Sequence, residues 1–212
     1  MRTSLFLFAA LSLAACQTAE RAANTAAEGV EDAADAVADA AGATYNAVED
    51  VFDDDDMTTA AALVRPTSAP GSTVQGVVRF HEMDGGLMVM VSLSGLRPGR
   101  HGLHIHQNPA CGPGPDGTPG GAAGGHWDPM GTGDHGAPGD PVDEKHLGDL
   151  GNVTASASGT VETTMTIDNF PVGEHDVAGH AVMVHQMGDD RETDPGGDAG
   201  TRVGCGVIAE RM

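Results

Sequence analysis

The sequence predicts an all-β domain, an antiparallel sandwich or barrel of about eight short strands with two long loops. Three observations carry this prediction. Aromatic residues make up only 3% of the chain, while glycine occurs 31 times and proline 12 times, so turn formers are abundant. From Thr58 onward, short apolar or alternating runs recur at regular intervals. Two stretches without such runs, roughly 108–148 and 187–201, are the long loops, and loops of this length are usually functional or disordered.

Residues 1–16 predict a targeting signal. Arg2 supplies a positive charge, 5–13 is a short apolar run, and small residues stand just before Cys16. The run is shorter than the roughly 20 apolar residues that a transmembrane helix needs. The pattern resembles a bacterial lipoprotein signal, in which Cys16 becomes the lipidated first residue of the mature chain. An ordinary secretory signal is the alternative.

Residues 17–57 differ sharply from the rest of the chain. They are rich in Ala, Glu and Asp, and alanine favours helix, so we expect intermittent helix between about 28 and 51. The four aspartates of 53–56 repel one another and favour a solvated segment. We interpret 17–57 as an acidic tether between the membrane and the domain. A partner-binding helix is the alternative.

The domain itself, 58–212, takes its strands from apolar periodicity. After an opening strand near 58–64, Val74, Gly76, Val78 and Phe80 alternate with residues that are polar except for Val77. The run 87–93 follows, closed by a glycine- and proline-containing turn at 95–99. The remaining candidate strands are 102–107, 151–157, 160–167, 179–186 and 203–209.

Histidines gather in the long loops and at strand ends, which favours a metal site. The period of two along a strand puts the imidazoles of His104 and His106 on one face. The other candidates lie in the first long loop or just before the second: His126, His135, His146 and Asp149 in the first, and His185 before the second. Six imidazoles and one carboxylate are therefore available.

This donor set suits two different metals. Four imidazoles suit tetragonal Cu(II), and three imidazoles with one carboxylate suit a closed tetrahedral zinc site. Seven residues fill eight positions only when one is shared, and an imidazole, with its two nitrogens, can bridge two ions. The spacing leaves open which histidine is the bridge.

At these residues the sequence resembles the copper,zinc superoxide dismutase family. The motifs are His-x-His, Gly-His-x-x-Pro, His-x-x-Asp-Leu-Gly-Asn, Val-His and Gly-x-Arg-x-x-Cys-Gly-Val-Ile, and they cover nearly all of 58–212. The resemblance implies an eight-stranded antiparallel Greek-key β-barrel or sandwich. It also implies an enzyme that converts superoxide into oxygen and hydrogen peroxide, with one redox-active copper and one structural zinc per subunit.

The resemblance also assigns residues. The copper ligands would be His104, His106, His126 and His185, and the zinc ligands would be His126, His135, His146 and Asp149, with His126 as the bridge. Arg202 would bind superoxide, His126 would also carry a proton, and Asp189 would join ligands of the two metals. Leu96 would plug one end of the barrel. The neighbouring His101 is expected to make a structural hydrogen bond.

The cysteines fit the same family. With Cys16 lipidated, Cys111 and Cys205 remain as a pair in an oxidising compartment, where the family has a disulfide. Two separate buried thiols are the alternative.

The charge is an objection, because superoxide is an anion and the net charge is −21. Screening acts over about 8 Å in physiological salt, so the local field matters more than the total. Arg202 supplies that field, and Arg191 of the second loop is expected to help. The second loop has no lysine and is acidic, with Asp190, Glu192, Asp194 and Asp198. We therefore expect slower capture of superoxide than in family members with lysine-lined loops.

Partners and location follow from these predictions. We expect superoxide as substrate, no nucleic acid, and a membrane contact through a lipid on Cys16 in the cell envelope. Gln17 after that cysteine favours the outer membrane, while the side that the domain faces and a homodimer stay open. The main alternative function is a non-enzymatic envelope protein that buffers or delivers copper, which would need neither Arg202 nor a complete zinc set. A second is an adhesion or structural module.

Overall fold

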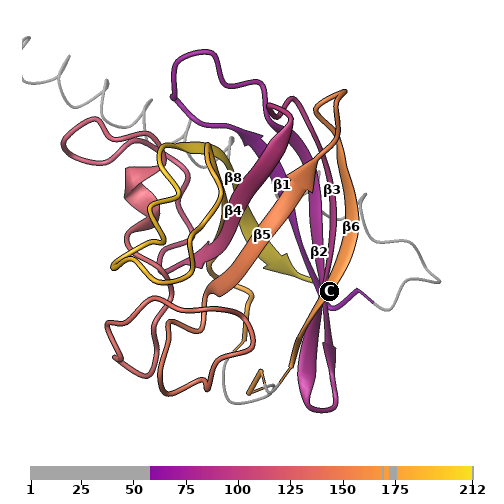
Figure 1. Cartoon of the computed structure of the whole chain (residues 1–212), viewed down its shortest axis with the longest axis vertical. Helices are drawn as coiled ribbons and strands as arrows, with labels where there is room; N and C mark the ends of the chain where they lie inside the picture. The colour runs from indigo at the N-terminus through magenta and orange to yellow at the C-terminus, as the bar shows by residue number, and fades with distance from the viewer. Residues whose placement is uncertain (1–57, 169, 172–175, 212) are drawn as a thin grey trace, which may run out of the picture. The chain divides into compact units, whose positions relative to one another are not determined.

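The computed structural model describes residues 58–168, 170–171 and 176–211, so the expected signal 1–16 and tether 17–57 lie outside the described residues. All eight predicted strands are present, with ends shifted by a few residues (Figure 1). Their bounds are β1 Ala60–Pro66, β2 Gln75–Met83, β3 Gly86–Ser94, β4 Gly99–His106, β5 Asp149–Ala155, β6 Val161–Asp168, β7 Ala181–His185 and β8 Arg202–Glu210. No helix in this part of the chain is long and apolar enough to cross a membrane.

The strands form one antiparallel sheet in the order β5-β4-β7-β8-β1-β2-β3-β6. Three consecutive strands, β1 to β3, are neighbours, but β3 pairs with β6 and β4 pairs with β7. The connections from β3 to β4 and from β6 to β7 therefore cross over, as in a Greek key. The outermost strands β5 and β6 also contact each other, which nearly closes the sheet into a barrel. The predicted fold class is confirmed.

The barrel interior is mainly aliphatic, as the scarcity of aromatic residues indicated. Alternation along β3 shows how it forms, because Leu87, Val89, Val91 and Leu93 are buried while the residues between them are partly exposed. Burying such side chains removes apolar surface from water, the dominant favourable term in folding. Leu96, in the turn before β4, packs against the same core, as expected.

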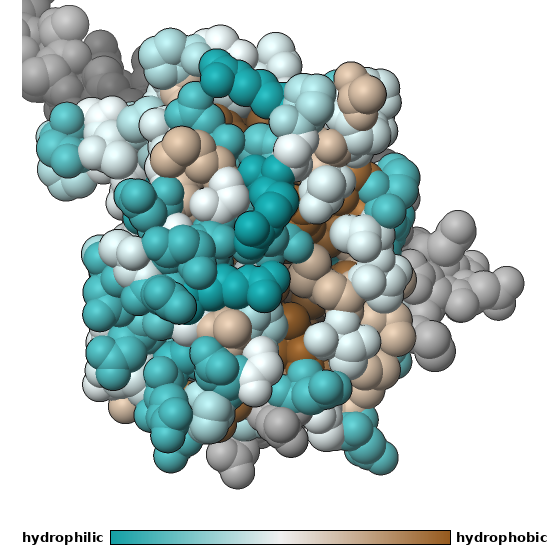
Figure 2. Space-filling view, viewed as in Figure 1, coloured by the Kyte–Doolittle hydropathy of each residue, from teal (hydrophilic) through white to brown (hydrophobic). Residues whose placement is uncertain are grey.

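Strand β4 places the predicted metal ligands. Leu103 and Ile105 are fully buried in the core, so His104 and His106 point to the opposite face of the strand. The two long loops lie on that side of the barrel (Figure 1). Figure 2 shows mostly hydrophilic side chains over the loops. The site therefore lies outside the barrel wall, under the loops.

Two details differ from the sequence prediction. The first long loop contains a short 3-10 helix, Gly121–Ala123, that the sequence did not predict. Asp149, expected inside that loop, is instead the first residue of β5, where it pairs with His104 of β4. This pairing joins segments that are far apart in the sequence, and local periodicity carries no information about it.

Candidate metal centre

All seven predicted ligands come together in two groups that share one side chain. In each group the potential ligand atoms lie within 4.8 Å of one another. The first group is His104, His106, His126 and His185, and the second is His126, His135, His146 and Asp149. Spacing alone left the shared residue open, and His126 is the one that belongs to both of these groups.

Strand pairing brings these side chains into register. Asp149 of β5 stands opposite His104 of β4, so the two groups meet on neighbouring strands. Arg202, the first residue of β8, stands opposite His185, the last residue of β7. His126 forms an isolated bridge with His106, which fixes the loop against β4.

In the first group, one nitrogen of each of three rings is held by an acceptor. His106 Nδ1 donates to Gly124 O at 3.0 Å, and His185 Nδ1 donates to Gly200 O at 3.1 Å. His104 Nε2 lies 2.9 Å from Asp189 Oδ2. These bonds orient the rings and leave the other nitrogen as the one that carries a lone pair.

The remaining nitrogens of the same rings are buried without a hydrogen bond. They are His104 Nδ1, His106 Nε2 and His185 Nε2. Buried polar atoms are almost always paired, since an unpaired one is destabilising by roughly 1–3 kcal/mol. Three such nitrogens converging beside a fourth imidazole fit a metal ion that prefers nitrogen ligands, as copper does.

In the second group, three imidazoles converge on one carboxylate. The Nδ1 atoms of His126, His135 and His146 lie 2.7, 3.0 and 3.4 Å from the Asp149 carboxylate. Although burial raises the pKa of Asp149, these three neighbours outweigh it and hold the pKa well below its usual range. Three imidazoles and one ionised carboxylate fit the donor set of a closed zinc site.

Burial also favours the neutral form of three rings in the first group. It holds the pKa values of His106 and His185 well below their usual range, and it lowers the pKa of His126 to about 4 despite its bond to Asp149. His135 is different, because the nearby carboxylates of Asp149 and Asp189 outweigh burial and raise its pKa to about 9. In the first group burial thus keeps His106, His126 and His185 neutral, whereas the second group is built around the fixed negative charge of Asp149.

Asp189 joins the two groups, as expected. Its side chain is fully buried, with Oδ2 facing His104 and Oδ1 lying 2.9 Å from His135 Nε2. The Asp189 backbone N–H donates to Asn152 Oδ1 at 2.8 Å, which fixes the loop that carries it. Bonds to both rings hold the pKa of Asp189 below its usual range, although burial acts in the opposite direction.

Arg202 stands at the mouth of the first group. Its Nη1 donates to Gly120 O at 2.9 Å and its Nη2 to Gly124 O at 2.8 Å. Gly124 O also accepts from His106, so one carbonyl orients both the guanidinium and a candidate ligand. Arg202, His126 and His185 line an open cleft of about 450 Å³. A small anion could therefore reach the guanidinium and the first group together.

The predicted disulfide is present. Cys111 in the first loop bonds to Cys205 of β8 across a sequence separation of 94 residues. The disulfide therefore links β8, which carries Arg202, to the loop whose carbonyls accept hydrogen bonds from Arg202. The alternative of two separate thiols is therefore wrong.

Other predictions near the site have different outcomes. His101 makes the expected structural hydrogen bonds, with its ring nitrogens 2.8 Å from Arg97 O and from His185 O. Arg191, expected to help attract the substrate, does not line the cleft. Its guanidinium is directed toward Gly151 instead.

Lys145 is a residue that the sequence analysis missed. Its side chain is only 1% exposed, and Nζ donates to His146 O at 3.1 Å. Burial lowers its pKa. The only sequence signal was its place next to His146, which does not distinguish a buried lysine from a solvated one.

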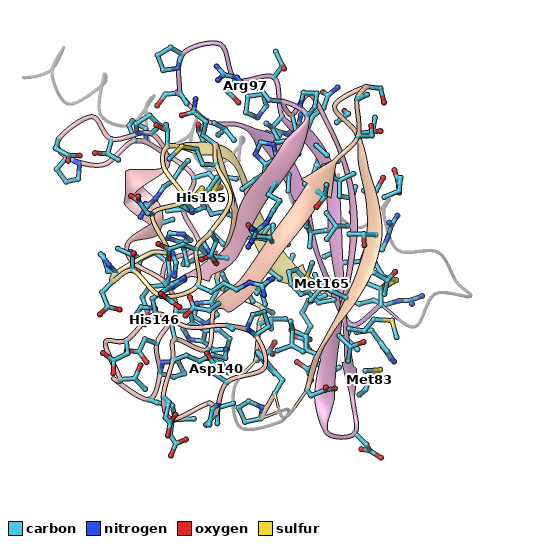
Figure 3. All side chains as sticks on the ribbon, viewed as in Figure 1. Met83, Arg97, Asp140, His146, Met165 and His185 are labelled. Atoms are coloured by element: carbon cyan, nitrogen blue, oxygen red, sulfur yellow. A yellow bond between two sulfur atoms is a disulfide. The ribbon has the colours of Figure 1, made fainter. Side chains whose placement is uncertain are left out.

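Figure 3 shows how the candidate site is separated from the rest of the barrel. His146 and His185 lie among the loops, whereas Met83 and Met165 lie near the strands on the other side. The two labelled candidate ligands therefore lie on the loop side of the barrel.

Comparison with known proteins agrees with the family resemblance of the sequence motifs. Residues 74–208 match the family model described as copper/zinc superoxide dismutase. The chain is 41% identical over 145 residues to the Cu-Zn superoxide dismutase of Haemophilus parainfluenzae, which covers 66% of this chain and 76% of that protein. It is 39% identical over 140 residues to the Cu-Zn superoxide dismutase of Deinococcus radiodurans, covering 64% of this chain and 77% of the relative. The structure of the Cu/Zn superoxide dismutase from Brucella abortus matches with a TM-score of 0.59 and 36% identity, over 69% of this chain and 97% of that one.

Proposed function

The chain belongs to the copper/zinc superoxide dismutase family, and from this membership we propose which of its side chains bind the metals and the substrate. The activity is dismutation, in which two superoxide ions and two protons give one molecule of oxygen and one of hydrogen peroxide. The relatives reported above are all named as superoxide dismutases, so they give no support to a copper-buffering protein.

We propose that the first group holds copper and the second holds zinc. His104, His106, His126 and His185 offer the four imidazoles that suit copper, and three of them present unpaired buried nitrogens. His126, His135, His146 and Asp149 offer the set that suits zinc. Copper supplies the reversible one-electron chemistry, while zinc, which has no redox chemistry, contributes structure and charge.

Arg202 and His126 act on the substrate in this proposal. The guanidinium, fixed by two carbonyls, attracts superoxide to the cleft and orients it there. His126 holds its Nδ1 toward Asp149, so Nε2 is the atom that accepts a proton and donates it to the peroxide product. The proposal rests above all on one observation, that two complete donor sets share the single ring of His126.

The test compares Arg202→Ala with the metal-loaded wild type. We expect the second-order rate with superoxide to fall about tenfold, because the cationic anchor for the anion is lost. The bound copper and zinc, measured by atomic spectroscopy, should not change. Arg65→Ala, which removes an exposed arginine of β1 that does not line the cleft, is the matched control and should keep the full rate. An unchanged rate in Arg202→Ala would remove this residue from the mechanism.

We also propose that residues 1–16 are a lipoprotein signal and that Cys16 is lipidated, which anchors 58–212 to the cell envelope through the acidic tether 17–57. The chain has three cysteines, and the disulfide uses the other two. Mass spectrometry of the membrane fraction should find acyl chains on Cys16. Cys16→Ser should release an active enzyme into the soluble fraction, and a variant that stays in the membrane would contradict the proposal.

A further inference from the structure

The charges at the mouth of the cleft have the wrong sign for an enzyme that captures an anion. Three carboxylates line it, those of Asp128, Asp194 and Asp198, while Arg202 is the only lysine or arginine among the lining residues that the structure describes. Histidines apart, negative side chains therefore outnumber positive ones at the entrance.

Two of these carboxylates have structural partners. Asp128 accepts hydrogen bonds from the backbone N–H groups of Thr132 at 3.2 Å and Gly133 at 2.9 Å, which shape a turn of the first loop. Asp194 Oδ1 accepts from the backbone N–H of His135 at 2.7 Å, which joins the two loops. Their local contacts explain why they are there.

Asp198 is different. Its carboxylate makes no hydrogen bond or ion pair with any described residue, and Asp198 is an exposed residue that lines the cleft. Its backbone has a positive φ of 49°, a conformation that aspartate and asparagine adopt more readily than most other residues. The flanking backbone is fixed, because Met187 N–H donates to Ala199 O at 2.9 Å and Gln186 N–H to Thr201 O at 2.7 Å. An unpaired negative charge is thus held in the wall that also contains Arg202.

We propose that the Asp198 carboxylate sets the rate at which this protein admits anions to the copper site, and also how that rate depends on salt. The proposal rests on the function proposed above. The carboxylate repels an incoming anion and offsets the attraction of Arg202. Because the screening length is about 30 Å at an ionic strength of 0.01 M and about 8 Å at 0.15 M, salt weakens this repulsion. Anion capture therefore becomes faster as salt increases, the reverse of an entrance with net positive charge.

The experiment uses the copper- and zinc-loaded protein and two substitutions that tolerate a positive φ, Asp198→Asn and Asp198→Gly. Asp84→Asn is the matched control, since it removes an exposed carboxylate from the turn between β2 and β3 that does not line the cleft. Two quantities are measured from about 0.01 to 0.3 M ionic strength. They are the dissociation constant of azide, a small anion that binds cupric ions, by visible absorption, and the rate with superoxide by pulse radiolysis.

We expect both Asp198 variants to bind azide and to capture superoxide about two- to fivefold better than wild type at low salt. The gain should shrink toward unity above about 0.15 M. The wild-type rate should rise with salt over the same range, and Asp84→Asn should follow wild type.

The proposal is overturned if Asp198→Asn matches Asp84→Asn, if the gain does not depend on salt, or if only one of the two neutral variants shows it. The copper and zinc content of each variant is measured as well. If one Asp198 variant loses metal, the result of the other variant tests the proposal. A wild-type protein that binds azide but leaves superoxide untouched would refute the proposed function, while the azide measurements would still decide the role of Asp198.

Discussion

At the scale of single residues, Asp189 shows how one buried carboxylate orients candidate ligands in both groups. One of its oxygens faces His104 and the other faces His135, each at 2.9 Å. An asparagine in its place can accept with only one of its two side-chain atoms, so one ring loses its acceptor. Because the ring that loses its bond also loses orientation and basicity, the metal site is weakened without loss of a ligand.

We therefore predict that Asp189→Asn lowers zinc affinity about 10- to 100-fold, measured by competition with a coloured chelator. Asp143→Asn removes an exposed carboxylate from the first long loop, away from both groups of candidate ligands, and should leave the affinity unchanged. Equal zinc affinity in both variants would show that Asp189 does not support the site.

Glu82 of β2 gives a residue-scale prediction far from the metals. Partial burial, with the Asp176 and Glu210 carboxylates nearby, raises its pKa, and His81 acts in the opposite direction. A raised pKa means that the folded state holds this proton more tightly than the unfolded state. The charged carboxylate is therefore destabilising above its folded pKa, and this effect disappears as the pH falls toward the ordinary value of 4.5.

Glu82→Gln should accordingly stabilise the fold at pH 8, by about 0.5 kcal/mol or less because the site is largely solvated. The gain should shrink at pH 5. Urea unfolding at the two pH values measures it, with Glu192→Gln as an exposed control. A gain that grows toward low pH would show that the sign is wrong.

At the scale of elements, the disulfide cross-links the first long loop to β8. In the chain-entropy model, closing a loop of 94 residues stabilises the fold by about 4–5 kcal/mol. The same loop supplies both carbonyls that hold Arg202. If the loop becomes mobile, the Arg202 guanidinium therefore becomes mobile with it.

We predict that the double variant Cys111→Ser, Cys205→Ser loses several kcal/mol of unfolding free energy, on the order of the loop-closure value. It should also lose superoxide rate while keeping its zinc. Urea unfolding and metal analysis measure the two effects. A stable variant with the full rate would mean that the hydrogen bonds alone hold the loop.

Periodicity predicted the elements well where neighbours in the sequence decide the structure. Alternation in β2 and β3 located both strands. The motif resemblance supplied all seven candidate ligands, which the structure brings together in two groups, because metal-binding motifs are defined by residue type and spacing. The short helix Gly121–Ala123 was not predicted, because it is held by backbone bonds within a glycine-rich loop.

What the sequence could not show depends on contacts between distant segments. Asp149 becomes a strand residue because it pairs with β4, and Lys145 is buried because the loop folds over it. Asp198 was visible as one acid among several in the second loop. Only the structure distinguishes it from Asp194, whose carboxylate accepts a hydrogen bond from the backbone N–H of His135.

At the scale of the whole molecule, metal binding and folding are coupled. The first group buries three unpaired nitrogens, and the second brings three imidazoles around one carboxylate. Ions that bind these sites but not the unfolded chain stabilise the fold by mass action, by about 4 kcal/mol at a thousandfold excess over the dissociation constant. For a domain of this size, each kcal/mol corresponds to about 2–4 °C in Tm.

Removing both metals should therefore lower Tm by about 10 °C or more in scanning calorimetry. Zinc alone should restore part of the loss, because it fills the group that contains Asp149, and copper should restore the rest. Identical melting of the metal-free and reloaded proteins would show that the two groups hold no ion.

The contact between β5 and β6 has a consequence for how copies of this protein meet. An open sheet presents rows of unpaired backbone amides and carbonyls, which can template the addition of strands from another chain. Here the two edge strands, β5 and β6, contact each other, so the sheet is nearly closed. The near-closure of the barrel thus limits aggregation by strand addition. A substitution that separated β5 from β6 would expose such a template without changing the candidate metal ligands.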